Sequence, residues 1–410
     1  MESSHVIVRV PVEVPVGEIW RRLRDGHRPT LIGAWLHLTV SFMVWLLMGA
    51  LSLPIAQALA LTPAELSWLI ALPLLGGTGL RLLGGWSCDW FGAKRTAVAI
   101  LLGEMAVLLW GWSVVPTIPV LWGIAILLGI GGASFAVALP LAGQAYPPAS
   151  QGLVLGLAAS GNIGTVLILF FAPRWAEWLG WQHVFGVMAG IVAATCVVFV
   201  WLVGDGRESH HRPRDVEWWH HAAELLRQRT AYWLCFLYAI TFGGFIGLCS
   251  VLPVLLHDTY QLEAVTAGSV AALCGLLGSV VRPLGGYAAD RRGGVQVLYV
   301  VLPVIGGAIV AVISPSLPIA VAMMVVACGA MGFGNGVVFQ LAAEGFSKQI
   351  GLVSGLIGAV GSIGGFLFPL AVSGLNVLTG TYATGLWFFA GLAVCAWGTV
   401  FFRLQRGASP

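Results

Sequence analysis

Long apolar segments alternate with short polar stretches along most of this chain of 410 residues. Each apolar segment has about 20 residues, the length that a helix needs to cross a bilayer core about 30 Å thick. The pattern predicts twelve membrane-spanning helices at residues 31–51, 65–87, 96–114, 117–143, 151–172, 181–203, 230–256, 265–288, 294–313, 317–341, 350–375 and 383–402.

The composition supports this prediction. Apolar residues make up 58% of the chain and charged residues only 9%, which excludes an ordinary soluble globular protein. The 55 glycines and 20 prolines would weaken soluble helices, but they allow membrane helices to approach closely and to bend. The expected fold class is an all-α membrane protein.

Basic residues predict the orientation of the spans. Seventeen of the 20 lysines and arginines fall on one set of loops and tails, against Arg174 alone on the other set. The positive-inside rule places the richer set in the cytoplasm. The chain is therefore expected in a bacterial-type inner membrane, with a cytoplasmic N-terminal tail at 1–30, six-helix bundles at 31–203 and 230–402, a cytoplasmic linker at 204–229 and a cytoplasmic C-terminal tail at 403–410.

Other classes of function find little support in the residues. The seven cysteines have no CxxC spacing, and the histidines of the linker lie among arginines and glutamates, so we expect no metal site. A phosphate-binding GxxxxGK loop and a catalytic triad or carboxylate pair are also absent from the sequence. We expect no enzyme activity, no cofactor and no nucleic-acid partner.

The two predicted bundles are related copies. The stretch RLLGGWSCDWFG from Arg81 aligns with RPLGGYAADRRG from Arg282, and GLVLGLAASGNIG from Gly152 aligns with GLVSGLIGAVGSIG from Gly351. A parallel pair of six-helix bundles is an architecture in which a substrate binds near the middle of the membrane, between the halves. The prediction is two pseudo-symmetric bundles around one central site.

Two arginines fall inside predicted spans. Arg81 and Arg282 each precede an aspartate, Asp89 or Asp290, by eight residues, which places them about 12 Å from the cytoplasmic boundary. Glu104 is the only acid deep in a span, so the excess of buried positive charge predicts an anion site. A planar guanidinium matches two oxygens of a planar oxyanion. The alternative is that each arginine binds backbone carbonyls or Glu104 for structural reasons.

The motifs are similar to those of the major facilitator superfamily and, within it, of the nitrate/nitrite porters. Two stretches resemble the superfamily motif, GGWSCDWFGAKR and GGYAADRRGG. In the first, Trp90 stands where a basic residue usually follows the aspartate. The resemblance to the porter signatures lies in GLVLGLAASGNIG and GLVSGLIGAVGSIG, here called the first and second Gly-rich stretches, and in YAITFGGFIG and GFGNGVVFQL. The resemblance covers most of the membrane portion and implies a transporter that works as a monomer in the lipid bilayer.

The resemblance also implies site residues. Arg81 and Arg282 match the anion-clamping arginines, Tyr238 a hydrogen-bond donor, Phe242 and Phe135 aromatic walls, and Asn162 a polar signature residue. Tyr238 and Phe242 share a helix face at a spacing of four residues. Ordinary helix packing remains the alternative for the three aromatic residues, and contact between helices for Asn162.

The remaining candidates concern the conformational change of the carrier and its coupling to protons. Gly161, Gly164, Gly361 and Gly364 belong to the Gly-rich stretches, which either slide as the halves move or pack statically. Glu104 and His37 are the groups inside spans that can carry a proton.

The predicted function is a secondary transporter of nitrate, nitrite or both. It would work by alternating access, coupled by exchange of the two anions or by proton symport. The alternatives are a porter for another small anion, such as a short carboxylate, and a membrane-embedded anion sensor.

Overall fold

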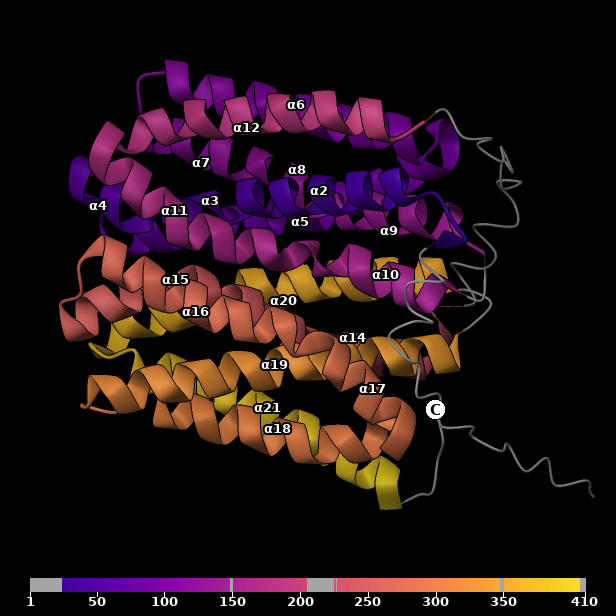
Figure 1. The fold of residues 1–410 in the computed structure, drawn as a ribbon. Coiled ribbons are helices and arrows are strands. Elements are labelled where there is room, and N and C mark those ends of the chain that lie inside the picture. The colour runs from indigo at the N-terminus through magenta and orange to yellow at the C-terminus, as the bar shows by residue number, and fades with distance from the viewer. Residues whose placement is uncertain (1–23, 148–149, 205–224, 226, 347–349, 406–410) are drawn as a thin grey trace, which may run out of the picture.

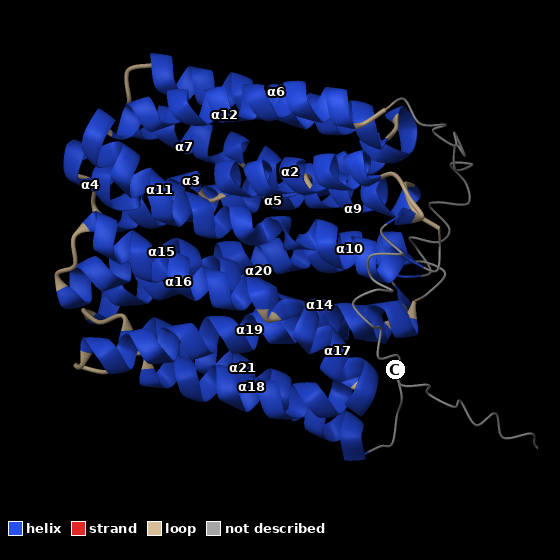
Figure 2. Ribbon diagram, in the orientation of Figure 1, coloured by secondary structure: helices blue, strands red, loops and turns tan. Residues whose placement is uncertain are grey.

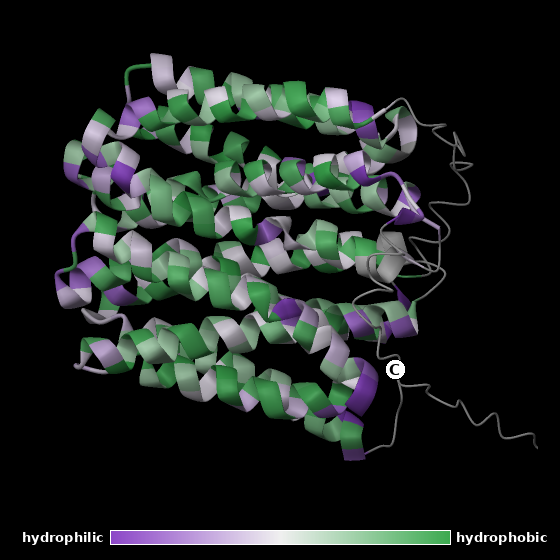
Figure 3. Ribbon diagram, viewed as in Figure 1, coloured by the Kyte–Doolittle hydropathy of each residue, from purple (hydrophilic) through white to green (hydrophobic). Residues whose placement is uncertain are grey.

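The computed structural model describes residues 24–147, 150–204, 225, 227–346 and 350–405. These residues form helices joined by short connections, without a strand in the described ranges (Figure 2). Most helices run roughly side by side (Figure 1). Hydrophobic residues cover much of their length, and many hydrophilic residues lie near their ends (Figure 3). The predicted tail at 1–30, linker at 204–229 and tail at 403–410 lie largely outside the described residues.

The N-terminal half contains the first six predicted spans. Its elements are α2 (Arg28–Trp45), α3 (Leu47–Ala50), α4 (Ser52–Leu59), α5 (Pro63–Phe91), α6 (Ala93–Ser113), α7 (Ile118–Leu128), α8 (Ile130–Ala133), α9 (Phe135–Gln144), α10 (Gln151–Ala159), the 3₁₀-helix η2 (Ser160–Ile163), α11 (Gly164–Leu179) and α12 (Trp181–Leu202).

The C-terminal half contains the other six. Its elements are α14 (Arg229–Tyr238), the π-helix η3 (Ala239–Gly243), α15 (Gly244–Tyr260), α16 (Ala264–Val280), α17 (Arg282–Arg292), α18 (Gly294–Ala311), α19 (Leu317–Gly345), α20 (Ile350–Thr379) and α21 (Ala383–Gln405).

Eleven helices among the described residues are long and apolar enough to cross a membrane. The first predicted span, 31–51, is not among these eleven; it is divided into α2 and α3, with interruptions at Leu46 and Leu51. Each of the twelve predicted segments is nevertheless helical over most of its described residues. Hydropathy located the spans, but it carried no information about where a helix breaks within one.

Glycines end equivalent helices in the two halves. Gly92 follows α5 with φ 88°, and Gly293 follows α17 with φ 84°. Gly180 and Gly380 repeat this arrangement after α11 and α20, with φ 86° and 73°. Side chains are disfavoured at these angles, whereas glycine adopts them readily. The repeated glycine that closes each Arg81 or Arg282 motif is therefore needed for the turn into the next helix.

The halves pack against each other where α5 lies along α20, and also toward the end opposite the N-terminus of α2 and the C-terminus of α21. There α11 packs on α16, and α3 and α4 pack on α15. Gly268 of α16 lies against the Leu169 carbonyl and Pro173 of α11, so the contact is close. At the other end, α9 and α10 pack within their own half, as do α14 and α17 (Figure 1).

Candidate functional site

Arg81 lies inside the unbroken helix α5 and is only 2% exposed. Its Nε donates to the Gly132 carbonyl at 2.9 Å, and its Nη1 donates to the Gly358 carbonyl at 2.6 Å. Its Nη2 is buried and has no hydrogen-bond partner in the part of the chain that the structure describes. Two backbone carbonyls thus orient the guanidinium and leave one nitrogen free to bind something else.

The bond to Gly358 connects the two halves, because α5 belongs to the first half and α20 to the second. A β-carbon at position 358 would lie 2.9 Å from the Arg81 Nη1, closer than a real β-carbon comes to another atom. The Gly358 carbonyl also accepts from the Ser362 hydroxyl at 3.1 Å. Glycine at 358 therefore allows the arginine to reach the backbone of α20.

Arg282 is the first residue of α17 and is 9% exposed. The chain leaves the helix at Val281, just before Arg282 and Pro283. Proline has no N–H to donate and disfavours helical geometry in the residue before it, which explains a break at this point. The Arg282 Nη2 donates to the Tyr238 hydroxyl at 3.2 Å, while its Nη1 is buried and finds no partner within the described ranges.

Aromatic rings surround both guanidinium groups. The Phe135 centroid lies 5.6 Å from the Arg81 Cζ and 5.8 Å from the Arg282 Cζ, so one ring is shared by both arginines. Trp45 lies 5.4 Å from the Arg81 Cζ, and Phe339 lies 5.3 Å from the Arg282 Cζ. Ring faces attract cations, most strongly where water is excluded. The arginines therefore meet at one aromatic-walled region between the halves.

Tyr238 and Phe242 form a stacked pair in this wall. Their ring centroids are 4.9 Å apart with an interplanar angle of 6°. The π-helix η3 begins directly after Tyr238 and contains Phe242, and such segments are frequent at functional sites. Gly361 packs against both rings, and Gly364 packs against Ala239. Glycines of the second Gly-rich stretch thus bring α20 against the wall.

The first Gly-rich stretch packs against α2 rather than against the aromatic wall. Gly161 packs against Leu38 of α2, and Gly164 packs against the Thr39 carbonyl. Asn162 is buried in η2, and its Oδ1 has no hydrogen-bond partner among the residues described. No described contact joins Asn162 to Arg81 or Arg282, so its part in an anion site stays a prediction.

Four other candidates lie outside the arginine pair. Asp89 and Asp290 occupy the last turns of α5 and α17, and Asp290 is exposed. Glu104 and His37 are completely buried within the first half, on α6 and α2. Among the described residues, no carboxylate pairs with Arg81 or Arg282, which leaves two uncompensated positive charges at the site.

Sequence reasoning missed Trp45 and Phe339 as parts of the wall. Phe339 lies within the stretch GFGNGVVFQL, so the resemblance of this stretch to the porter signatures could have identified it as a site residue. No sequence feature distinguished Trp45, because it is one of many aromatic residues in apolar spans.

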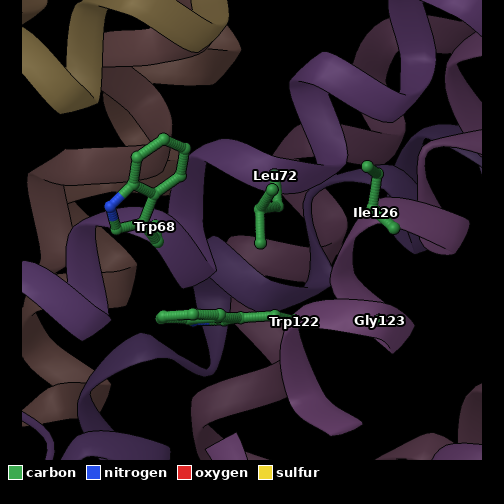
Figure 4. Close-up of a pocket in the computed structure, with 5 residues that line it drawn as sticks. All are labelled: Trp68, Leu72, Trp122, Gly123 and Ile126. Carbon is green, nitrogen blue, oxygen red and sulfur yellow. The ribbon is translucent and has the colours of Figure 1, made fainter. Parts of the chain in front are cut away.

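A separate cavity of about 400 Å³ lies between α5 and α7 (Figure 4). It is lined by Trp68, Leu72, Trp122, Gly123 and Ile126, which carry no charged group. Trp68 also approaches Phe366 of α20, with ring centroids 6.1 Å apart. This cavity offers nothing that would hold an anion.

The described residues form an all-helical membrane protein whose two repeated halves meet at the paired arginines. Residues 33–369 match the family described as the Major Facilitator Superfamily. A solved bacterial homologue of the human lysosomal transporter Spinster, in an inward-facing and occupied conformation, has the same fold, with a TM-score of 0.69 and 16% sequence identity over 92% of this chain and 96% of that one.

Curated relatives are more similar in sequence. The nitrite extrusion protein of Bacillus subtilis is 30% identical over 85% of this chain and 88% of its own length. The probable nitrate/nitrite transporter NarK2 of Mycobacterium tuberculosis is 30% identical over 89% and 93%, and the probable nitrate transporter NarT of Staphylococcus carnosus is 31% identical over 91% and 95%.

The chain belongs to the Major Facilitator Superfamily and, within it, to the nitrate/nitrite porter family. The predicted family and the all-α fold of two six-helix bundles are confirmed. The protein is a multi-pass membrane transporter and not an enzyme, as predicted.

Proposed function

We propose that this protein carries nitrate, nitrite or both across the membrane, holding the anion between the Arg81 Nη2 and the Arg282 Nη1. One observation carries the proposal: each half contributes a buried guanidinium nitrogen that has no partner among the described residues, beside a ring that both arginines share. A flat monovalent anion bound there would supply the missing acceptors and reduce the uncompensated charge.

The chemistry of the wall favours a small and weakly hydrated anion. A hydrogen bond between a guanidinium and a charged acceptor stabilises by about 1.5–3 kcal/mol, and two such bonds orient a planar ligand. Aromatic residues exclude water and lower the local dielectric, which strengthens these bonds and penalises a heavily hydrated divalent anion. Nitrate and nitrite satisfy both conditions. The printed names of the relatives, each a nitrate or nitrite transporter, support the same substrate class.

Transport would follow from motion of the bundles 31–203 and 230–402 around this site. Contacts between α11 and α16, and between α3, α4 and α15, close one end. With the basic loops in the cytoplasm, the termini face the cytoplasm of an inner membrane. Both arginines come from one chain, so a monomer is sufficient.

Flux through purified protein in proteoliposomes tests the proposal. Vesicles loaded with nitrite should accumulate labelled nitrate at equal pH on both sides, and excess unlabelled nitrite should compete. Competition by formate as strong as that by nitrite would indicate a carboxylate porter instead. The absence of any flux from correctly inserted protein would contradict transport and favour the anion sensor.

A further inference from the structure

Arg174 forms a hydrogen bond between the two halves outside the anion site. Its Nη2 on α11 donates to the Ser269 hydroxyl of α16 at 2.9 Å. Arg174 lies five residues before the end of α11 at Leu179, and Ser269 lies five residues after the start of α16 at Ala264. At 1.5 Å per residue, both are about 8 Å from those helix ends. The bond is therefore near the end of the molecule opposite the N-terminus of α2 and the C-terminus of α21 (Figure 1).

Helix α11 itself orients the Arg174 side chain. The Nη1 donates to the Phe170 carbonyl one turn earlier, and the Cζ lies 3.7 Å from the centroid of the Phe170 ring, whose face attracts the guanidinium. Both contacts lie within α11, so they persist when α11 and α16 separate. Among the described contacts of this guanidinium, only the bond from Nη2 to Ser269 depends on the other half.

Ser269 is placed to accept this bond. Its hydroxyl donates to the Val265 carbonyl at 2.7 Å within α16, which leaves the oxygen to accept from Arg174. The preceding residue, Gly268, lies against α11, where an added β-carbon would come within 2.6 Å of the Leu169 carbonyl oxygen. Glycine at 268 therefore allows α16 to approach α11 closely enough for the serine to meet the arginine.

The two partners suit a contact that has to break and form again. Arg174 and Ser269 are both half-buried, so water can replace each partner when the helices separate. Among the described residues, no carboxylate pairs with Arg174. Breaking a buried ion pair leaves an uncompensated charge and is costly, whereas a guanidinium that exchanges one hydroxyl for water loses much less. The bond can thus favour one conformation without fixing it.

We propose that the Arg174–Ser269 hydrogen bond is a gate contact, which holds this end of the carrier closed and breaks each time the end opens. The inference rests on the proposed movement of the bundles 31–203 and 230–402, because α11 and α16 belong to opposite bundles. A contact made in only one conformation shifts the equilibrium toward that conformation. Loss of the bond should therefore raise the ratio of open to closed carriers about tenfold.

A cysteine between α11 and α16 can report how often this end opens. Ala272 is 3% exposed and lies on the same α16 face as Gly268 and Gly275. Gly268 lies against α11, and an added β-carbon at Gly275 would lie 3.6 Å from Val166 of α11. In purified protein, Ala272→Cys should react slowly with a water-soluble, membrane-impermeant maleimide. The labelling of the chain without this cysteine is subtracted.

The test compares labelling rates of chains that all carry Ala272→Cys. Ser269→Ala should raise the rate about tenfold, because the end opens more often. The matched control is Ser113→Ala, which removes a hydroxyl that bonds to carbonyls of its own helix, α6. Ser269→Thr keeps a hydroxyl and should label at the parent rate. Arg174→Met should act as Ser269→Ala does, and the two together should raise the rate no further than either alone.

The outcomes separate the gate contact from the anion site. Equal rates in Ser269→Ala and Ser113→Ala would overturn the gate contact, as would effects of Ser269→Ala and Arg174→Met that simply add. If Arg174→Met fails to fold, Ser269→Ala against Ser269→Thr decides, and equal rates in these two contradict the proposal. The labelling needs no nitrate, so these failures leave the anion site standing. Absence of flux from inserted wild-type protein overturns the anion carrier instead.

Discussion

The two buried arginines occupy equivalent positions in the duplicated halves, yet they are held in different ways. Arg81 lies within an unbroken helix and donates to two backbone carbonyls, one of which belongs to the other half. Arg282 begins a helix after a break and donates to one phenol hydroxyl of its own half. Arg81 is thus fixed by the backbone of both halves, whereas Arg282 has more freedom to adapt to a ligand.

One residue of the repeat accounts for the break. Leu82 follows Arg81, while Pro283 follows Arg282. Leucine continues the helix, and proline removes a backbone donor and disturbs the residues before it. Duplication therefore kept the charge at both positions but allowed each half to hold it by different means.

Replacing the arginines by lysine should have the largest effect. Lysine keeps the charge, but its donors all lie on one nitrogen and cannot replace the separate guanidinium nitrogens that reach Gly132, Gly358 and an anion. Loss of two charge-assisted hydrogen bonds, each about 1.5–3 kcal/mol, should lower nitrate uptake by Arg81→Lys at least about 100-fold. Arg282→Lys should lose less, because Arg282 has one described partner. A larger loss in Arg282→Lys, in vesicles with equal protein, would reverse the comparison.

Removing the Tyr238 hydroxyl should have a smaller effect. Tyr238→Phe keeps the ring that stacks on Phe242 and deletes the described hydrogen bond to Arg282. One such bond predicts a half-saturation constant for nitrate about tenfold higher, with little change in the maximal rate. Uptake measured over a range of nitrate concentrations gives both values, and an unchanged constant would remove Tyr238 from the site.

Adding a methyl group at Gly358 tests the bond between the halves. Gly358→Ala should push the Arg81 guanidinium away from the α20 carbonyl, because the new carbon would meet Nη1. We expect uptake to fall about fivefold. The matched control is Gly355→Ala on the same helix, where an added carbon meets nothing within 4 Å. Equal losses in the two variants would show a general effect on α20 rather than displacement of Arg81.

Making the second repeat like the first should have the smallest effect. Pro283→Leu restores a backbone donor and should close the break before α17. The Arg282 guanidinium would shift, and the half-saturation constant should rise about threefold, which corresponds to less than about 1 kcal/mol. Identical kinetics in Pro283→Leu and wild type would mean that the break does not position Arg282.

Much of the fold could be predicted from sequence because lipid imposes long apolar helices and the duplication is visible in the motifs. Arg81 and Arg282 stood out because a charge inside a span is costly. The bond from Arg81 to Gly358 could not be predicted, since it joins residues 277 positions apart through a backbone carbonyl. The break at Leu46 and the π-helix after Tyr238 also depend on packing that no local pattern records. The role of Asn162 stays a prediction.

An experimental structure with bound nitrate tests the central claim most directly. We expect a planar density between the two arginines, with oxygens within hydrogen-bond distance of the Arg81 Nη2 and the Arg282 Nη1 and its face toward the Phe135 ring. Nitrate bound elsewhere, or either arginine paired with a carboxylate in its presence, would contradict the account.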